Sequence, residues 1–156
     1  MRKPSIFSIV IGLGLLAGLY ASAVSAAELK VLCADALKPA VQELAPAFEK
    51  SSGHKLSIQY DTAENIEKKV AAEDPIDVAI LTKPQVDKLV RVAKLVGGSM
   101  ATLASTQNPE VVFVGAAPPY SEQALPAKAF IDFLAAPANK EVYKAKGLEP
   151  AERAAS

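Results

Sequence analysis

Two short turns, Ala34-Asp35-Ala36 and Asp61-Thr62-Ala63, each follow a predicted strand and precede a predicted helix. In a parallel α/β sheet, ligands bind outside the carboxyl ends of the strands, where the N-termini of helices present free amide groups. Tyr60 ends the second of these strands and either lines the ligand-binding cleft or is an ordinary half-buried aromatic residue of the strand. The candidate ligand-binding residues are therefore Ala34, Asp35, Ala36, Tyr60, Asp61, Thr62 and Ala63.

The aspartates in both turns oppose tight binding of an anion. A carboxylate beside a helix start gains about 0.3–1 kcal/mol from the helix dipole and can cap the free amides itself. A second negative charge close to such a carboxylate is repelled, and more strongly when it is partly desolvated. Asp35 and Asp61 are therefore either ordinary caps at solvated turns or groups that lower the affinity for an external anion.

Cation binding at the same place is a weaker interpretation. Asp35, Asp61 and Glu64 could supply carboxylate oxygens, but calcium takes about six to eight oxygen ligands and the spacing matches no known loop signature. Lys83, at the end of the third predicted strand, could answer either aspartate or point into water. We expect no metal site and no cofactor.

The residues that could act in catalysis do not form a recognisable set. Cys33 lies in an apolar strand and is expected to be an inert core residue, and as the only cysteine it has no intramolecular disulfide partner. His54 is the only histidine and is expected in a solvated turn. The chain contains no nucleophile elbow. We therefore expect a protein that is not an enzyme.

The N-terminal segment has the layout of a secretory signal peptide. Two basic residues precede an apolar run over residues 6–20, and small residues follow over residues 21–27. Cleavage after Ala26 fits this layout, and cleavage after Ala27 fits almost as well. The alternative is a permanent anchor, although the run is short for a membrane span of about 20 residues. We predict a signal peptide over residues 1–26 and a periplasmic protein.

The remaining chain is the size of one domain and is nearly neutral. Without residues 1–26 it has 130 residues, and acids outnumber Lys and Arg by two. A domain of this size buries roughly two-thirds of its extended surface, so it can fold without a metal or a disulfide. No basic stripe interleaved with aromatic residues is present, which excludes nucleic acid as an expected partner.

Strand and helix patterns alternate along the chain. Strands are predicted at residues 29–33, 55–60, 76–81 and 111–114, with a weaker signal at 100–103. Apolar residues at helical spacing predict five helices. The first runs from Leu37 to a glycine cap at Gly53 with a kink at Pro46, and the second is marked by Ile66 and Val70 and closed by Pro75. The third starts at Lys83 and has Ala93 on its apolar face, the fourth covers residues 127–134, and a shorter fifth helix lies beyond Pro137 and ends at Gly147. This alternation predicts an α/β fold with a doubly wound, mostly parallel sheet and helices on both faces.

Three stretches in order carry a resemblance to a known family. They read ELKVLCADALKPAVQELAPAFEKSSGHKLSIQYDTA, DPIDVAILTKPQVDKLV and AFIDFLAAPANKEVYKAKGLEPA. The chain thereby resembles the exported solute-binding proteins of ABC importers, in particular the molybdate-binding type with the type 2 periplasmic-binding-protein fold. The resemblance implies two lobes that close over a ligand. It also implies a small anionic solute, an oxyanion or a carboxylate, and an ABC permease as partners.

This chain departs from the family in two respects. Between Gly98 and Val111 there are only about a dozen residues, too few for the second lobe. Relatives of the molybdate type place small hydroxyl residues in the two turns, whereas this chain has Ala36 and Ala63 there and keeps only Thr62. We therefore predict a truncated, single lobe over residues 27–150 with a disordered tail at 151–156, in which ligand binding is weak or lost.

Two further expectations follow from a missing lobe. The chain could serve instead as a periplasmic protein-interaction module, or be a remnant that binds no ligand. An apolar floor exposed by the loss of one lobe could also pair two cleft faces in a homodimer.

Overall fold

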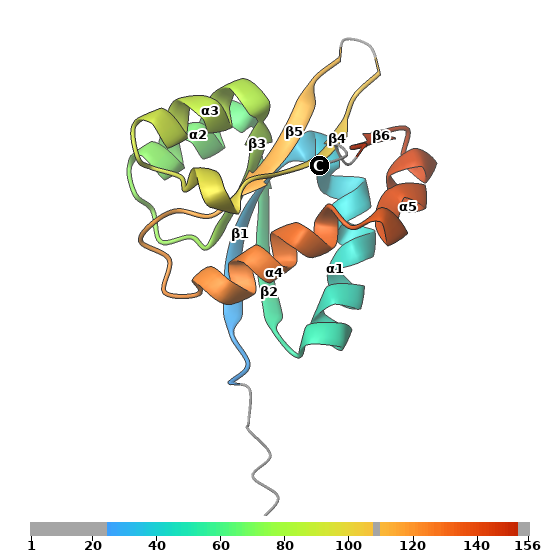
Figure 1. Cartoon of the computed structure of the whole chain (residues 1–156), viewed down its shortest axis with the longest axis horizontal. Coiled ribbons are helices and arrows are strands. Elements are labelled where there is room, and N and C mark those ends of the chain that lie inside the picture. Colours follow the sequence, from blue (N-terminus) through green and yellow to red (C-terminus); the bar gives the residue numbers. More distant parts are fainter. Residues whose placement is uncertain (1–24, 108–109, 153–156) are drawn as a thin grey trace, which may run out of the picture.

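The computed structural model describes residues 25–107 and 110–152. These residues build a single six-stranded sheet with helices packed on it (Figure 1). Almost all of the predicted signal segment, residues 1–24, lies outside the described residues, as do residues 153–156 of the predicted tail. Within the described part of the chain, no helix combines the length and the apolar composition that crossing a membrane requires.

The sheet confirms the predicted α/β class. Its strand order is β2-β1-β3-β5-β4-β6. β1 is parallel to both β2 and β3, while β5 is antiparallel to β3, and β4 is antiparallel to β5 and β6. Four strands therefore run in one direction, and β5 and β6 run against them. The bounds are β1 Glu28–Ala34, β2 Lys55–Asp61, β3 Val78–Thr82, β4 Ala101–Ser105, β5 Val112–Ala116 and β6 Glu149–Pro150.

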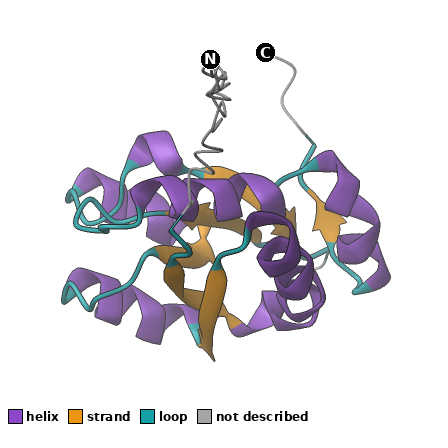
Figure 2. Ribbon diagram, turned by 90° about the horizontal axis from the view of Figure 1, so that it is seen from below, coloured by secondary structure: helices purple, strands orange, loops and turns teal. Residues whose placement is uncertain are grey.

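Helices cover both faces of the sheet, as predicted (Figure 2). One face carries α1 (Lys38–Ser52), α4 (Ala124–Leu134) and α5 (Lys140–Ala145), and the other carries α2 (Ala63–Ala71) and α3 (Lys83–Arg91). Successive side chains of a strand point to opposite faces, so Val31 and Cys33 enter the first core and Leu32 the second.

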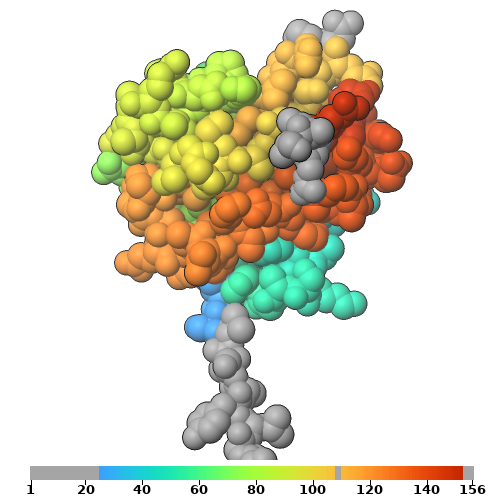
Figure 3. Space-filling view, in the orientation of Figure 1, coloured from blue at the N-terminus to red at the C-terminus, as the bar shows by residue number. Residues whose placement is uncertain are grey.

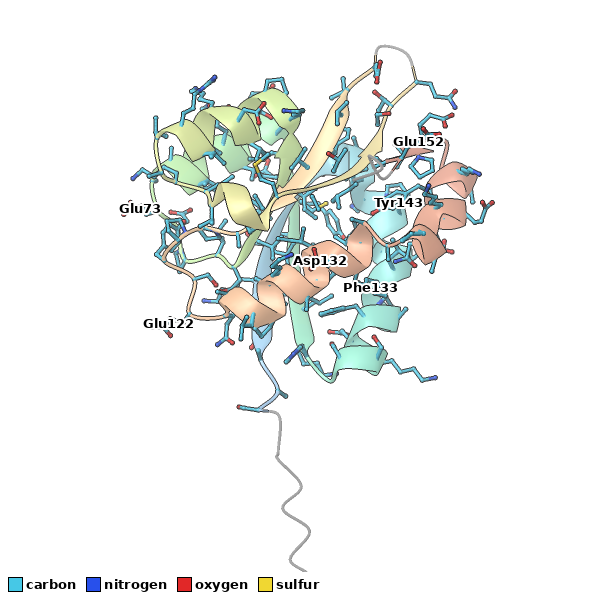
Figure 4. The ribbon with its side chains drawn as sticks, in the orientation of Figure 1. Glu73, Glu122, Asp132, Phe133, Tyr143 and Glu152 are labelled. Carbon is cyan, nitrogen blue, oxygen red and sulfur yellow. The ribbon has the colours of Figure 1, made fainter. Side chains whose placement is uncertain are left out.

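Aromatic residues fill the larger core. Phe48 of α1 packs on Phe130 and Phe133 of α4 with ring centroids 5.0 and 5.5 Å apart. Tyr143 of α5 is 1% exposed, and its hydroxyl donates a hydrogen bond to the Leu134 carbonyl at 3.0 Å. Figure 4 labels Phe133 and Tyr143 on α4 and α5. These contacts hold three helices on one face of the sheet.

The first helix has the predicted punctuation. A 3-10 turn, η1 (Asp35–Leu37), leads from β1 into α1, and the helix continues through Pro46, which faces solvent. Gly53 ends α1 with a left-handed φ of 76°, and its amide donates to the Glu49 carbonyl at 3.0 Å. Residues with a side chain rarely adopt this φ, which explains the glycine here.

The third helix is shorter than predicted. α3 ends at Arg91, so Ala93 is not part of its apolar face and is exposed instead. Ala93 has a φ of 57°, and the next amide, that of Lys94, donates back to the Leu89 carbonyl at 2.8 Å. This reversal returns Leu95 to the core. The apolar residues thus keep a helical spacing as far as Ala93, although the helix itself ends at Arg91.

The crossing segment forms part of the same sheet. β4 and β5 are neighbours in a hairpin, and β4 corresponds to the weak strand signal. The base of the hairpin is closed by Ser99, whose hydroxyl donates to the Val96 carbonyl at 2.7 Å and accepts the Ala117 amide at 2.8 Å. The described residues thus form one lobe, as the short connection predicted.

Candidate functional site

The two predicted turns lie side by side at the carboxyl edge of the sheet. In the β1–β2 register Ala34 is the partner of Asp61, so the turns that follow these residues are neighbours. Ala34 is buried, whereas Asp35, Ala36 and Thr62 are exposed. The sequence therefore placed these residues together correctly, although their role in binding stays a prediction.

At the second turn, the chain's own side chains occupy the start of α2. Asp61 Oδ1 accepts the Thr62 amide and the Asn65 side-chain amide, both at 2.8 Å, and Asp61 Oδ2 accepts Lys69 Nζ at 3.1 Å. Thr62 is the N-cap residue, and its hydroxyl accepts the Asn65 backbone amide at 3.3 Å. An incoming anion would have to displace these acceptors.

These bonds also stabilise the charged form of Asp61. The hydrogen bond from Asn65 is the largest cause, followed by the Thr62 amide and Lys69, and together they hold the pKa of the Asp61 carboxyl below its usual value. Asn65 and Lys69 were missed at the level of sequence. They follow Asp61 by four and eight residues, a spacing that places them on one helical face and could have revealed them.

The first turn is organised differently. Ala34 precedes η1 and offers no side-chain cap, and the helical segment that follows has Pro39 in its first turn. Asp35 and Ala36 are exposed above a buried Leu37. This turn thus leaves its amides without a side-chain acceptor, while the second turn supplies two.

Tyr60 marks the edge of the sheet between the turns and α1. It is half-buried, and Lys38 Nζ lies 5.5 Å from its ring centroid. Burial, and then the neighbouring Cys33 thiol, raise the pKa of Tyr60 to about 12. Lys38 is a positive group at this edge that the strand and turn patterns did not indicate.

Lys83 forms an ion pair with neither Asp35 nor Asp61. Its ammonium pairs with Asp87 at 2.7 Å within α3, and Lys69 is the cation that pairs with Asp61. At the end of β3, Thr82 donates its hydroxyl proton to Gln85 Oε1 at 2.6 Å. Gln85 in turn donates to Glu67 of α2 at 3.1 Å. The third strand end is therefore linked to α2 rather than to the turns.

The possible catalytic groups lie apart. Cys33 is fully buried, as predicted, and burial and then Asp35 raise the pKa of its thiol. The expectation of a solvated His54 is wrong, because the ring is half-buried against Phe48 and its Nδ1 accepts the Ala27 amide at 3.0 Å. Across residues 25–107 and 110–152, no three His, Cys, Asp or Glu side chains gather as a metal site.

Three hollows on the described surface have volumes of about 310, 400 and 550 Å³. None of the three is lined by a residue of the predicted turns or by Tyr60. The predicted turns thus lie outside these three hollows.

An α/β lobe with paired strand-to-helix turns at one edge of its sheet has the architecture of a lobe of a ligand-binding protein. The family model for the bacterial extracellular solute-binding protein matches residues 29–108, and the chain belongs to this family. No curated protein sequence is significantly similar to the chain.

Solved structures share the fold at low sequence identity. The substrate binding domain of a putative molybdenum ABC transporter from Clostridium difficile is similar with a TM-score of 0.74 and 12% identity, over 81% of this chain and 100% of that one. The Azotobacter vinelandii periplasmic molybdate-binding protein is similar with a TM-score of 0.72 and 12% sequence identity, over 80% of this chain and 100% of that protein. The sulfate-binding protein SubI from Mycobacterium tuberculosis is similar with a TM-score of 0.67 and 10% sequence identity, over 82% of this chain and 88% of that protein.

Proposed function

We propose that this chain is an exported, single-lobe solute-binding protein of the ABC-importer type, with weak or lost binding of small oxyanions or carboxylates. Family membership supports the solute-binding class. The structurally similar molybdate-binding and sulfate-binding proteins support an anionic solute. The proposed ligand edge comprises Ala34, Asp35, Ala36, Tyr60, Asp61, Thr62 and Ala63.

The observation that carries the proposal of weak binding is the occupied start of α2. The Asp61 carboxylate accepts the Thr62 amide and the Thr62 hydroxyl accepts the Asn65 amide, which are two of the backbone donors at this helix start that an oxyanion could use. A helix N-terminus attracts anions because its amides are free and its dipole is positive. Here the Asp61 carboxylate already lies at the helix start and accepts one of its amides, and Asp35 adds a second carboxylate beside the neighbouring turn.

A single lobe weakens binding further. Small-ligand sites usually bury about 70–90% of the ligand surface. The described residues supply only one wall at the carboxyl edge, since the crossing segment forms the β4–β5 hairpin of the same sheet. A bound anion would keep much of its hydration shell, so the net gain from the protein contacts is small.

The proposal includes export and processing. We propose that residues 1–26 are removed as a signal peptide, that residues 27–150 are the working lobe and that 151–156 form a tail. The Ala27 amide and carbonyl pair with His54 Nδ1 and the Lys55 amide, at 3.0 and 2.8 Å, which supports a folded lobe that starts at this residue. The partner would be an ABC permease in the membrane, and the location the periplasm.

Binding rather than catalysis is also part of the proposal. Cys33 is the strongest nucleophile type among the described residues, but its thiol is buried and its pKa is raised, which disfavours the reactive thiolate.

Thermal unfolding with molybdate, sulfate, phosphate and succinate tests this function. A ligand present at about 100 times its dissociation constant adds roughly 2.7 kcal/mol to stability, a shift that is easily measured. We expect no shift at micromolar concentrations and at most a small one at millimolar concentrations. A shift produced by micromolar molybdate or sulfate would overturn the proposal of weak binding.

The second candidate function is a periplasmic protein-interaction module. Its supporting observation is that the lobe is internally satisfied without a ligand: in the described part of the chain no buried side-chain nitrogen or oxygen lacks a hydrogen-bond partner. Capture of the permease by the purified chain without any solute would favour this function. Capture that requires solute would favour solute delivery.

A homodimer through the cleft faces is not part of the proposal. The large apolar side chains exposed on the described surface are Val92, Val96 and Leu125, and none belongs to the predicted turns. The apolar floor that motivated this dimer is therefore missing from the described edge. Sedimentation velocity at high protein concentration should show a monomer.

A further inference from the structure

The largest of the three hollows, about 550 Å³, lies between α3 and the beginning of β5. Val112, which is half-buried and packs against the core on the α3 side of the sheet, is an apolar part of its lining, as is Pro84 of α3. Figure 3 shows the surface of α3 beside that of the β4–β5 hairpin at the top of the view. The predicted turns after β1 and β2 contribute nothing to this hollow.

Four charged side chains line the hollow, of which two form an ion pair with each other and two do not. Lys83 and Asp87 pair with each other at 2.7 Å. Arg91 and Glu110 are both exposed and both line the hollow, yet neither forms an ion pair with any residue in 25–107 or 110–152. The hollow thus offers one free guanidinium, one free carboxylate and an apolar floor.

We propose that this hollow binds a small zwitterion with an apolar body, of the class of an aliphatic α-amino acid. The ligand carboxylate pairs with Arg91, whose planar fork suits bidentate recognition of a carboxylate. The ligand ammonium pairs with Glu110, and its aliphatic side chain covers Val112 and Pro84. This inference goes beyond the proposed function, because it places a second ligand class at a different part of the lobe.

Simpler ligands fit this set of groups less well. An inorganic oxyanion would meet Glu110 as a like charge and would leave Val112 and Pro84 in water. An organic cation without a carboxylate would leave Arg91 unpaired beside Lys83. Only a molecule with both charges and an apolar part uses all three features. The volume lies within the range of about 300–1,000 Å³ that small-molecule sites occupy.

The expected affinity is low. The hollow is open to solvent at Arg91 and Glu110, and exposed ion pairs gain little because water screens them. We therefore expect a dissociation constant on the order of 1 mM for a ligand of this size.

Titration by NMR with leucine as the probe tests the inference. We expect saturable shifts of Val111 and Val112 amide signals. We expect binding at least about tenfold weaker for 4-methylpentanoate, which lacks the ammonium, and for isopentylamine, which lacks the carboxylate. Glycine, which keeps both charges without the apolar body, should also bind more weakly. Equal binding of all four probes, or no saturation by leucine at about 10 mM, would overturn the inference.

Variants locate the site and separate it from the proposed function. Arg91→Gln and Glu110→Gln should each weaken leucine binding about tenfold. Glu122→Gln, an exposed carboxylate outside this hollow, is the matched control and should bind as the parent chain does (Figure 4). Unaltered leucine binding in both Arg91→Gln and Glu110→Gln would contradict the assignment. The oxyanion panel does not involve these residues, so its result stands independently.

An internal alternative is tested without a probe. If Arg91 and Glu110 simply pair with each other in solution, the stability losses of Arg91→Gln and Glu110→Gln will be coupled in a double-mutant cycle. We expect additive losses. Clear coupling would mean that the two charges serve each other and would overturn the proposal.

Discussion

Asp77 and Asp61 are carboxylates at opposite ends of the parallel strands: Asp77 lies at the amino end of β3 and Asp61 at the carboxyl end of β2. Asp77 precedes β3 and is 9% exposed, and its Oδ2 accepts the Lys30 amide of β1 at 2.9 Å while its Oδ1 accepts the Ser121 hydroxyl at 2.6 Å. Asp61 is the last residue of β2, its side chain is 27% exposed, and its partners all lie within the next eight residues.

The difference lies in what each carboxylate connects. Asp77 forms hydrogen bonds to segments more than 40 residues away in sequence, so long-range bonds connect the chain at the amino ends of the parallel strands, here called the amino edge. Asp61 completes its own helix start and joins nothing distant. Because its bonds are local, the groups at the carboxyl ends of β1 and β2 can be changed without loss of the fold.

The strongest test of this contrast is Asp77→Ala. The substitution leaves the Lys30 amide and the Ser121 hydroxyl without their acceptor, and hydrogen bonds to charged groups contribute about 1.5–3 kcal/mol each. We expect the free energy of unfolding in urea to fall by about 3 kcal/mol. Asp77→Asn keeps one acceptor oxygen and should lie between Asp77→Ala and the parent chain. A loss below about 1 kcal/mol in Asp77→Ala would show that the amino edge is not held by this residue.

At the carboxyl edge, Thr62→Ala should have a smaller effect. It removes the N-cap bond to the Asn65 amide, and loss of such a cap costs about 0.5–2 kcal/mol. We expect a decrease of about 1 kcal/mol in urea unfolding. Thr62→Ser keeps the hydroxyl and serves as the control, which should unfold close to the parent chain. Equal losses in Thr62→Ala and Thr62→Ser would assign the effect to packing instead of the cap.

The parts of the fold that the sequence predicted depend on local periodicity. The apolar run of β3 and the helical spacing of α1 were visible because burial imposes a repeat on neighbouring residues. The same holds for the link from Asp61 to Asn65 and Lys69, which spacing could have revealed. The predicted end of α3 was wrong, because the chain turns at Ala93 with a left-handed φ, and an alanine in the sequence does not indicate such a turn.

Features that depend on distant pairing could not be read in this way. The β4–β5 hairpin is closed by Ser99, which bonds to Ala117 18 residues away, and nothing in the small, polar stretch around Ser99 indicates that bond. Lys38 and Tyr60 meet only because β1 and β2 pair in parallel. The long-range structure thus supplies contacts for which the sequence shows no local pattern.

Lys38→Gln tests one of those contacts and should have a small effect. Lys38 is exposed, and a cation over an aromatic ring at an exposed site contributes about 0.5–1 kcal/mol. We expect a loss of about 0.5 kcal/mol in urea unfolding. Lys38→Arg keeps a cation over Tyr60 and should restore the parent value. A large loss in Lys38→Gln would mean that this edge is tied to the core as strongly as the amino edge is.

Asp61→Asn should have the smallest effect on stability at neutral pH, because the carboxylate lies in solvent and the asparagine oxygen can still accept the Thr62 amide. Its effect depends on pH. The pKa of Asp61 is lowered in the folded chain, so its charge stabilises the fold above the unfolded value of about 3.9. That stabilisation is lost as the pH falls through the lowered folded-state pKa.

The parent chain should therefore melt slightly above Asp61→Asn at pH 7, and this difference should disappear in thermal scans as the pH drops well below about 4. Asn65→Ala, which removes the largest contribution to the lowered pKa, should reduce the same pH dependence while leaving the charge in place. A difference that persists unchanged in acid would show that the Asp61 charge does not stabilise α2. If the carboxylate excludes anions, Asp61→Asn should also bind sulfate more tightly than the parent chain does, so one substitution tests both the local cap and the self-occupied ligand edge.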